Sequence, residues 1–168
     1  MRQNRNFTAK KSTEMIRKLI AFSILLVTIV SCTKIDTPDL VDYGPIDKKI
    51  IQDYLTVHND TTAKSTTSGL YYIIQNPGGS AHPLINSTVT VKYSGYLVDG
   101  NPFDSSSTPY TNKLYNLITG WQEGLQLIGA GGKMRLFIPS GLGYGATAIG
   151  SIPAHSVLIF DIELVSFK

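Results

Sequence analysis

The sequence predicts an α+β domain in which an antiparallel sheet of five to six strands wraps over one short helix. Segments between residues 70 and 167 show the two-residue alternation, or the β-branched and aromatic composition, that is typical of strands. One short segment among them, which holds the chain's only tryptophan, shows helical spacing instead. A further helical segment precedes all of the strands, and we expect it to be an accessory helix.

The first 31 residues have the pattern of an export signal. Six basic residues precede an apolar run of twelve residues from Leu19 to Val30, which is too short to span a bilayer and suits the core of a signal peptide. The run ends at Ile29-Val30-Ser31-Cys32, which resembles the bacterial lipobox, a signal whose cysteine becomes the acylated first residue. We therefore expect a lipoprotein signal peptide at 1–31 and lipidation at Cys32. The alternative is an ordinary signal peptide with a chance cysteine.

Charge and composition exclude several classes of function. The net charge of +3 comes from the amino terminus, because from Cys32 onward nine Lys and Arg residues stand against eleven Asp and Glu residues. Such a mildly acidic domain is a poor candidate for nucleic-acid binding. Cys32 is the only cysteine, so no internal disulfide and no catalytic thiol are expected in the folded part. The three histidines lack ligand-like spacing, so we predict no metal site and no cofactor.

The segment after the signal divides into a tether and an accessory helix. Residues 32–44 mix Asp, Pro and Thr with few large apolar side chains, which suits a flexible tether. Apolar residues then recur at intervals close to three and four, which predicts an amphipathic helix from Pro45 to His58. Residues 59–68 are rich in Thr, Ser and Asp and are expected to form a loop. We group residues 45–68 as the accessory helix and its linker, a packed accessory or spacer without chemistry of its own.

The predicted strands follow in chain order. The strand at 70–75 is predicted from its composition and closes at Asn76-Pro77-Gly78-Gly79, and the strand at 88–97 alternates and leads to a turn at Asp99-Gly100. A short strand at 103–106 precedes a predicted polar loop at 107–112. Alternation at 133–139 and 156–167 predicts the last two strands.

The short internal helix is predicted from its start signal and its spacing. Thr119 and Gln122 fit a capping box, in which each side chain satisfies a backbone N–H of the first turn. Trp121, Leu125 and Ile128 recur on one face, and Gly129 ends the segment. Taken alone, Trp121 is most simply a core residue.

Seven motifs, in a fixed order, change that interpretation. They are Val91-Lys92-Tyr93-Ser94-Gly95, Asp99-Gly100, Phe103-Asp104-Ser105-Ser106, Ile118-Thr119-Gly120-Trp121-Gln122-Glu123-Gly124, Gly143-Tyr144-Gly145, Ile152-Pro153 and Leu158-Ile159-Phe160-Asp161-Ile162-Glu163-Leu164. Together they resemble the FKBP family of peptidyl-prolyl cis-trans isomerases, and the resemblance covers residues 69–168. The lipobox and the helix that follows it resemble the arrangement in bacterial lipoprotein members of this family.

The resemblance implies a pocket with aromatic walls, in which Trp121 is the floor under the substrate's proline ring. Asp104 would be a buried polar group at the rim, Tyr144 a hydroxyl donor, and Ile118 a backbone N–H donor to a substrate carbonyl. The implied catalytic residues are thus Asp104, Tyr144 and Ile118. The implied substrate-binding residues are Tyr93, Phe103, Leu117, Trp121, Ile152 and Phe160. Taken without the motifs, the same aromatic set could be ordinary core, and Asp104 could be a turn residue.

The sequence departs from the family pattern at two places. Many members have a Phe between the Asp motif and the Trp helix, where it closes one side of the pocket. Here residues 110–116 contain no Phe, and Tyr110 is the nearest substitute. The loop at 146–151 is shorter than in some members, in which it contacts substrates and macrolide inhibitors.

Such a pocket needs no nucleophile, metal or cofactor. Amide resonance sets a barrier of about 18–20 kcal/mol to rotation about an X–Pro bond, and a site that binds the twisted amide better than the planar forms lowers that barrier. The first hypothesis is therefore a peptidyl-prolyl cis-trans isomerase that acts on exported proteins. The second is a proline-segment-binding chaperone or assembly factor with little turnover, and the third is a structural envelope lipoprotein with a degenerate pocket.

The expected partners are proline-containing unfolded or exported polypeptides, the membrane through the anchor at Cys32, and macrolide inhibitors. No nucleic acid is expected among them. The expected location is the cell envelope, with the lipid anchor in the outer membrane and the domain facing the periplasm.

Overall fold

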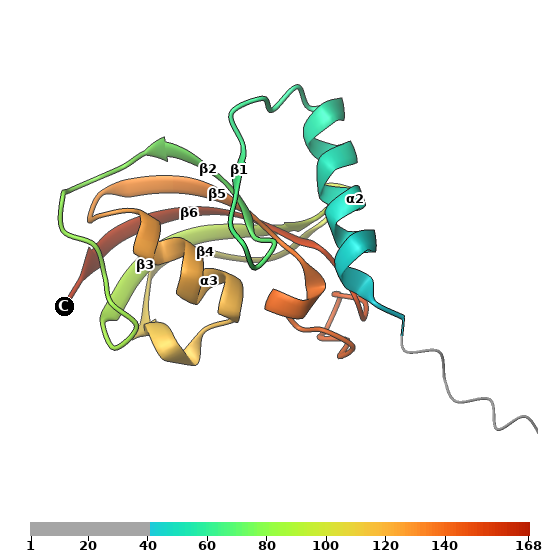
Figure 1. Ribbon diagram of the computed structural model, residues 1–168. Coiled ribbons are helices and arrows are strands. Elements are labelled where there is room, and N and C mark those ends of the chain that lie inside the picture. Colours follow the sequence, from blue (N-terminus) through green and yellow to red (C-terminus); the bar gives the residue numbers. More distant parts are fainter. Residues whose placement is uncertain (1–40) are drawn as a thin grey trace, which may run out of the picture. The chain divides into compact units, whose positions relative to one another are not determined.

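The computed structural model describes residues 41–168, so the predicted signal peptide, Cys32 and most of the tether lie outside the described residues. The helices and strands are α2 (Tyr43–Val57), β1 (Lys64–Ser65), β2 (Tyr71–Asn76), β3 (Thr88–Leu97), β4 (Pro102–Lys113), α3 (Thr119–Gly124), β5 (Gly132–Ile138) and β6 (Leu158–Phe167) (Figure 1). Short 3₁₀ helices lie at Leu114–Asn116, Leu125–Leu127 and Ser140–Leu142. The strands form one six-stranded sheet in the order β1-β2-β5-β6-β3-β4, and every neighbouring pair is antiparallel. The predicted α+β class is confirmed.

Two predicted loops contain strands. Residues 107–112, predicted as a polar loop, are the second half of β4, which pairs with β3 through Thr90 opposite Thr111 and Val91 opposite Tyr110. The Thr90 and Thr111 hydroxyls are 2.9 Å apart. Because β4 is an edge strand, it tolerates polar side chains and a proline that a central strand would not. Similarly, Lys64 and Ser65 of the predicted loop 59–68 form β1 at the opposite edge.

The predicted capping box at the start of α3 is wrong. The residue that precedes the helix is Ile118, and no side chain caps it. Gln122 instead reaches backward, and its Nε2 donates to the carbonyl oxygens of Leu117, at 2.7 Å, and Tyr115, at 3.2 Å. The amide thus ties α3 to the 3₁₀ turn before it, which stabilises the path of the chain at this corner.

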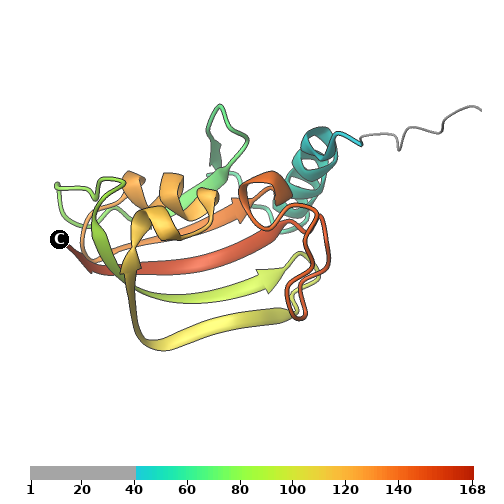
Figure 2. The same cartoon turned by 90° about the horizontal axis from the view of Figure 1, so that it is seen from below.

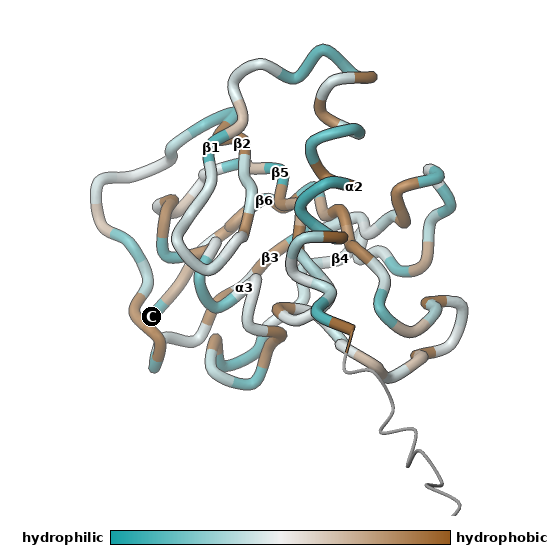
Figure 3. Tube along the Cα trace, turned by 45° about the vertical axis from the view of Figure 1, so that its right-hand side comes forward, coloured by the Kyte–Doolittle hydropathy of each residue, from teal (hydrophilic) through white to brown (hydrophobic). Residues whose placement is uncertain are grey.

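The sheet is covered on both faces, and alternation along the strands separates the two cores. Leu136 and Ile138 of β5 point into the core that contains Trp121 of α3. Phe137, between them, points to the other face and packs with Ile51 of α2. Along α2 itself, hydrophobic residues are interspersed among hydrophilic ones (Figure 3). The accessory helix therefore packs on the opposite face of the sheet from α3.

Helix α2 lies beside the long connection between β5 and β6, residues 139–157. Figures 1 and 2, which differ by a quarter turn, both place this connection next to the amino-terminal half of α2. The helix begins at Tyr43 rather than at the predicted Pro45, because the Asp42 side chain accepts a hydrogen bond from the Gly44 N–H at 3.0 Å and so caps the first turn. None of the described helices is both long enough and apolar enough to cross a membrane.

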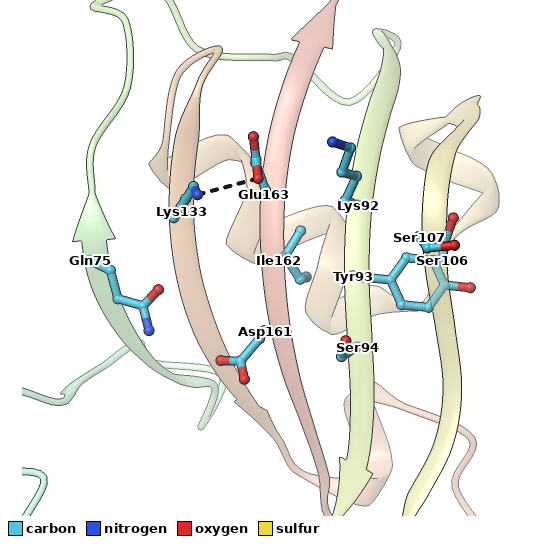
Figure 4. A pocket seen from close by; sticks show the side chains of 10 residues that line it. All are labelled: Gln75, Lys92, Tyr93, Ser94, Ser106, Ser107, Lys133, Asp161, Ile162 and Glu163. Carbon is cyan, nitrogen blue, oxygen red and sulfur yellow. Dashed lines mark ion pairs between the residues drawn. The ribbon is translucent and has the colours of Figure 1, made fainter.

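Beyond α2, the outer face of the sheet is polar. Figure 4 shows a shallow groove there, lined by side chains such as Gln75, Lys92 and Asp161. Lys133 and Glu163 form an ion pair across it at 3.4 Å, and Arg135 donates two hydrogen bonds to Asp161 nearby, at 2.7 and 2.9 Å. Pairs with this exposure contribute little to stability. The side chains that line this groove are mainly polar or charged, and the predicted aromatic site residues other than Tyr93 lie elsewhere.

Candidate active site

A cavity of about 340 Å³ opens on the α3 side of the sheet. It is lined by Tyr93, Asp104, Tyr110, Asn112, Asn116, Leu117, Ile118, Trp121, Tyr144 and Phe160. The structure thus brings together seven of the nine predicted site residues, from three strands (β3, β4 and β6), helix α3 with the two residues before it, and the loop after β5. Phe103 and Ile152 do not line the cavity.

Trp121 lies beneath two aromatic walls. Its indole meets the ring of Tyr93 edge to face, with centroids 5.0 Å apart and planes at 80°, and meets Phe160 at 5.1 Å and 87°. Aromatic pairs prefer this edge-to-face arrangement. The indole is only 5% exposed, and its Nε1–H has no hydrogen-bond partner within residues 41–168. The base of the cavity is therefore a fixed aromatic surface.

Phe103 supports this surface from behind instead of lining the cavity. Its ring meets Phe160 at 5.3 Å and 85°. The two rings can approach because residue 95 on the neighbouring strand is glycine: a Cβ there would lie 2.6 Å from the Phe103 ring and 2.8 Å from the Phe160 ring. Gly95 in the family motif is thus explained by the space that these rings occupy.

Ile152 turns into the core instead of flanking the entrance. Ile149 and Ile152 exchange two backbone hydrogen bonds, of 3.0 and 2.8 Å, which fold the loop back on itself. This turn leaves Ile149 45% exposed and Ile152 only 6% exposed. Sequence spacing could not show which of these two isoleucines would point inward.

Asp104 is exposed, whereas a buried carboxyl was predicted. It lies on β4, the edge strand of the sheet that residues 41–168 form. Its Oδ2 accepts a 2.7 Å hydrogen bond from the Tyr93 hydroxyl. Burial, and after it the bond to Asp104, raise the pKa of the Tyr93 hydroxyl. The carboxylate therefore holds the Tyr93 ring in place as a protonated donor.

Two further donors face the cavity. Burial raises the pKa of Tyr144, and the Asp104 carboxylate raises it further, so the Tyr144 hydroxyl stays protonated at neutral pH and can donate. The Ile118 carbonyl accepts from the N–H groups of Trp121 and Gln122, at 2.9 and 3.1 Å, while the Ile118 N–H bonds to no other residue of the described range. Both groups can hold a carbonyl oxygen of a bound peptide.

The comparison with protein families decides what this arrangement is. A family model described as FKBP-type peptidyl-prolyl cis-trans isomerase matches residues 79–165, which is more than half of the chain. The chain belongs to this family. The FKBP match spans the chain from just before β3 to β6, and so includes every strand and helix that lines the cavity.

FKBP-type proteins of known sequence and structure agree. The isomerase FkpA of Aeromonas hydrophila is 38% identical over 164 residues, covering 95% of this chain and 59% of the relative. FkpA of Buchnera aphidicola from Schizaphis graminum is 50% identical over 107 residues, covering 61% of this chain and 42% of the relative. The crystal structure of FkpA from Escherichia coli matches with a TM-score of 0.67 and 29% identity, over 100% of this chain and 74% of that one. The chain thus spans about half the length of these curated relatives.

The cavity of this FKBP domain is also lined by three residues that were not among the predicted site residues: Tyr110 and Asn112 of the predicted loop 107–112, and Asn116 beyond it. Tyr110, the residue expected to replace the missing family Phe, lies on the wall, with its ring centroid 6.3 Å from that of Tyr93. Asn112 Nδ2 donates to the Tyr110 hydroxyl at 2.8 Å, and Asn116 Nδ2 donates to Asn112 Oδ1 at 3.4 Å. No sequence signal marked the two asparagines, because polar residues are common both in a predicted loop, where Asn112 lies, and in the segment after it, where Asn116 lies. They make this rim polar.

Proposed function

We propose that this chain is a peptidyl-prolyl cis-trans isomerase that acts on X–Pro bonds of exported proteins. The observation that carries the proposal is the cavity whose floor is the Trp121 indole and whose walls are Tyr93 and Phe160, with hydroxyl and N–H donors at its side. A proline ring is apolar and flat enough to lie on such a floor, and the preceding carbonyl then reaches the donors.

The chemistry is non-covalent. In a twisted amide the nitrogen regains its lone pair and the carbonyl loses conjugation, so an apolar surround favours the twisted form over the more polar planar forms. Tyr144 and the Ile118 N–H hold the carbonyl groups on either side of the rotating bond. Asp104 fixes Tyr93 and adds a negative charge at the rim. Lowering the barrier by about 6–8 kcal/mol would accelerate exchange roughly 10⁴- to 10⁶-fold.

An isomerisation assay on a short X–Pro peptide tests the proposal. We expect wild-type protein to accelerate the exchange, Tyr144→Phe to lower kcat/KM roughly 10-fold because one hydrogen bond is lost, and Asp104→Leu to lower it by at least as much because Tyr93 also loses its acceptor. Asp104→Asn is the matched control, since its amide oxygen still accepts from Tyr93, and we expect it to retain more activity than Asp104→Leu. Wild-type protein that does not accelerate exchange at all would refute the proposal.

The second candidate is a module that binds proline-containing segments with little turnover. The polar rim of Tyr110, Asn112 and Asn116 favours it, because these side chains can hydrogen-bond to a peptide backbone in both of its planar forms. A protein that binds unfolded chains with wild-type affinity, and loses that binding on Asn112→Ala, while exchange stays at the uncatalysed rate, would favour this candidate.

We also propose that the chain is anchored in the cell envelope through an acylated Cys32, with the domain in the periplasm on the outer membrane. The lipobox-like sequence Ile29-Val30-Ser31-Cys32 supports this. Multiple acylation would anchor stably, as a single chain would not. We expect Cys32→Ala to leave the domain folded but to remove the protein from the membrane fraction. A Cys32→Ala protein that stays with the membrane would contradict the anchor.

Macrolide inhibitors of the family are further candidate ligands of the cavity above Trp121.

A further inference from the structure

Helix α2 contains a buried carboxylate that the mechanism does not use. Asp47 is only 1% exposed, and it pairs with no basic side chain in the described part of the chain. Its Oδ2 accepts hydrogen bonds from the backbone N–H of Ser140, at 2.8 Å, and from the Ser140 hydroxyl, at 2.7 Å. Its Oδ1 has no partner among those residues. Burying a carboxylate is costly unless it is hydrogen-bonded, so the two bonds from Ser140 are what stabilises Asp47 in this buried place.

The bonds continue from Ser140 to Tyr144. Ser140 begins the 3₁₀ turn Ser140–Leu142, and its carbonyl oxygen accepts from the N–H groups of Gly143, at 3.0 Å, and Gly145, at 2.8 Å. These glycines are the two chain neighbours of Tyr144. Both chain neighbours of Tyr144 are therefore hydrogen-bonded to the residue that Asp47 holds.

A second contact ties the end of the same loop to α2. The Gly145 carbonyl accepts from the His155 N–H at 2.7 Å, and the His155 ring stacks on Tyr43 of α2, with centroids 3.6 Å apart and planes at 5°. His155 has a φ of 58°, which few residues other than glycine adopt and which persists only where the surroundings hold it. The loop is thus tied to α2 at two places, through Ser140 to Asp47 and through His155 to Tyr43.

We propose that α2 is a positioning element of the active site: Asp47 and Tyr43 hold Ser140 and His155, and thereby set the place of the Tyr144 hydroxyl over the Trp121 floor. Asp47 is then a positioning residue, since it does not line the cavity. The inference rests on the proposed isomerase function. It replaces the expectation that the helix is a spacer without chemistry, because a donor works best when the surrounding structure fixes it beforehand.

Three variants of α2 test this in the isomerisation assay, each at a temperature where circular dichroism shows it fully folded. Asp47→Ala leaves both Ser140 donors without an acceptor, and we expect kcat/KM to fall roughly 10-fold, about as far as in Tyr144→Phe, because the hydroxyl is then misplaced. Asp47→Asn keeps an acceptor oxygen, and we expect it to stay within about threefold of wild type. The control is Ile51→Ala, which weakens the packing of the same helix without touching the loop bonds, and we expect wild-type kcat/KM per folded molecule.

A double-mutant cycle with Tyr144→Phe separates positioning from a general loosening. If Asp47 acts through the Tyr144 hydroxyl, Asp47→Ala should lower activity much less in the Tyr144→Phe background than in wild type. An equal loss in both backgrounds, or an equal loss in Ile51→Ala, would overturn the proposal. Amide hydrogen exchange distinguishes its failure from that of the isomerase function. Faster amide exchange at Gly143 and Gly145 in Asp47→Ala, but not in Ile51→Ala, supports the positioning role of Asp47 even in a protein that proves inactive. Unchanged exchange at these two glycines rejects that role.

Discussion

Replacing Trp121 by alanine is expected to lower kcat/KM by roughly 100-fold or more, and to lower the free energy of unfolding by about 3–5 kcal/mol. Both effects have one cause. The indole contacts Tyr93 and Phe160 edge to face and is 5% exposed, so its removal leaves a hole beneath both walls. Water then enters the base of the cavity, and the apolar surround that favours a twisted amide is lost. The measurements are the isomerisation assay and chemical denaturation followed by far-ultraviolet circular dichroism.

Leu125→Ala is the matched control for this variant. Leu125 follows α3 directly, is fully buried in the same core, and does not line the cavity. Its truncation should lower the free energy of unfolding by about 2–5 kcal/mol while kcat/KM per folded molecule stays near wild type. If the two variants lost activity in equal proportion, the indole would be a core residue only, as its sequence context alone suggests.

The largest expected effect on stability alone is that of Gly129→Ala. Residue 129 is buried where the segment after β2 crosses the segment before β5, and a Cβ there would lie 1.8 Å from the Gly79 carbonyl oxygen. Backbone atoms cannot move aside as the end of a side chain can. The two segments are also joined by hydrogen bonds from Gly129 N to Pro77 O, at 2.8 Å, and from Gly79 N to Ala130 O, at 2.9 Å. We therefore expect a loss of at least about 3 kcal/mol, the upper end for overpacking.

Gly141→Ala is the control, because a Cβ at residue 141 would meet nothing within 4 Å and φ there is not positive. We expect it to change the free energy of unfolding by no more than about 0.5 kcal/mol. The midpoint of thermal unfolding should fall by roughly 10 °C or more for Gly129→Ala and stay nearly unchanged for Gly141→Ala. Equal midpoints for the two variants would contradict the prediction, because they would show that the two segments can move apart to admit a methyl group without loss of stability.

Periodicity found the central strands but not the edges of the sheet. Residues 88–97 and 133–139 alternate because one face of each strand is buried, and the structure has strands at nearly the same residues. Residues 107–112 show no such pattern, since β4 has exposed residues along most of its length. Only the pairing with β3 makes this segment a strand. That pairing also carries Tyr110 and Asn112 to the cavity.

The motif pattern identified the aromatic residues of the site but not the part that each one plays. Tyr93, Trp121 and Phe160 meet in the cavity, while Phe103 lies behind Phe160 in the space left by Gly95. Asp104 was expected to be buried and is exposed. Which side of a ring faces a cavity depends on strand register and on neighbours from other strands, and neither is encoded in the local spacing of residues.

By itself the sequence determined the α+β class, the order of the elements and the family, because each of these follows from local periodicity or from short motifs read in order. Only the tertiary structure decided that Ile152 points inward, that residues 107–112 form a strand, and that Asp47 reaches Ser140 across 93 residues. The physical reason is the separation along the chain over which each kind of signal acts. Spacing records which side of its own strand or helix a residue occupies, whereas a contact between distant segments depends on how the whole sheet twists and which loop its end meets.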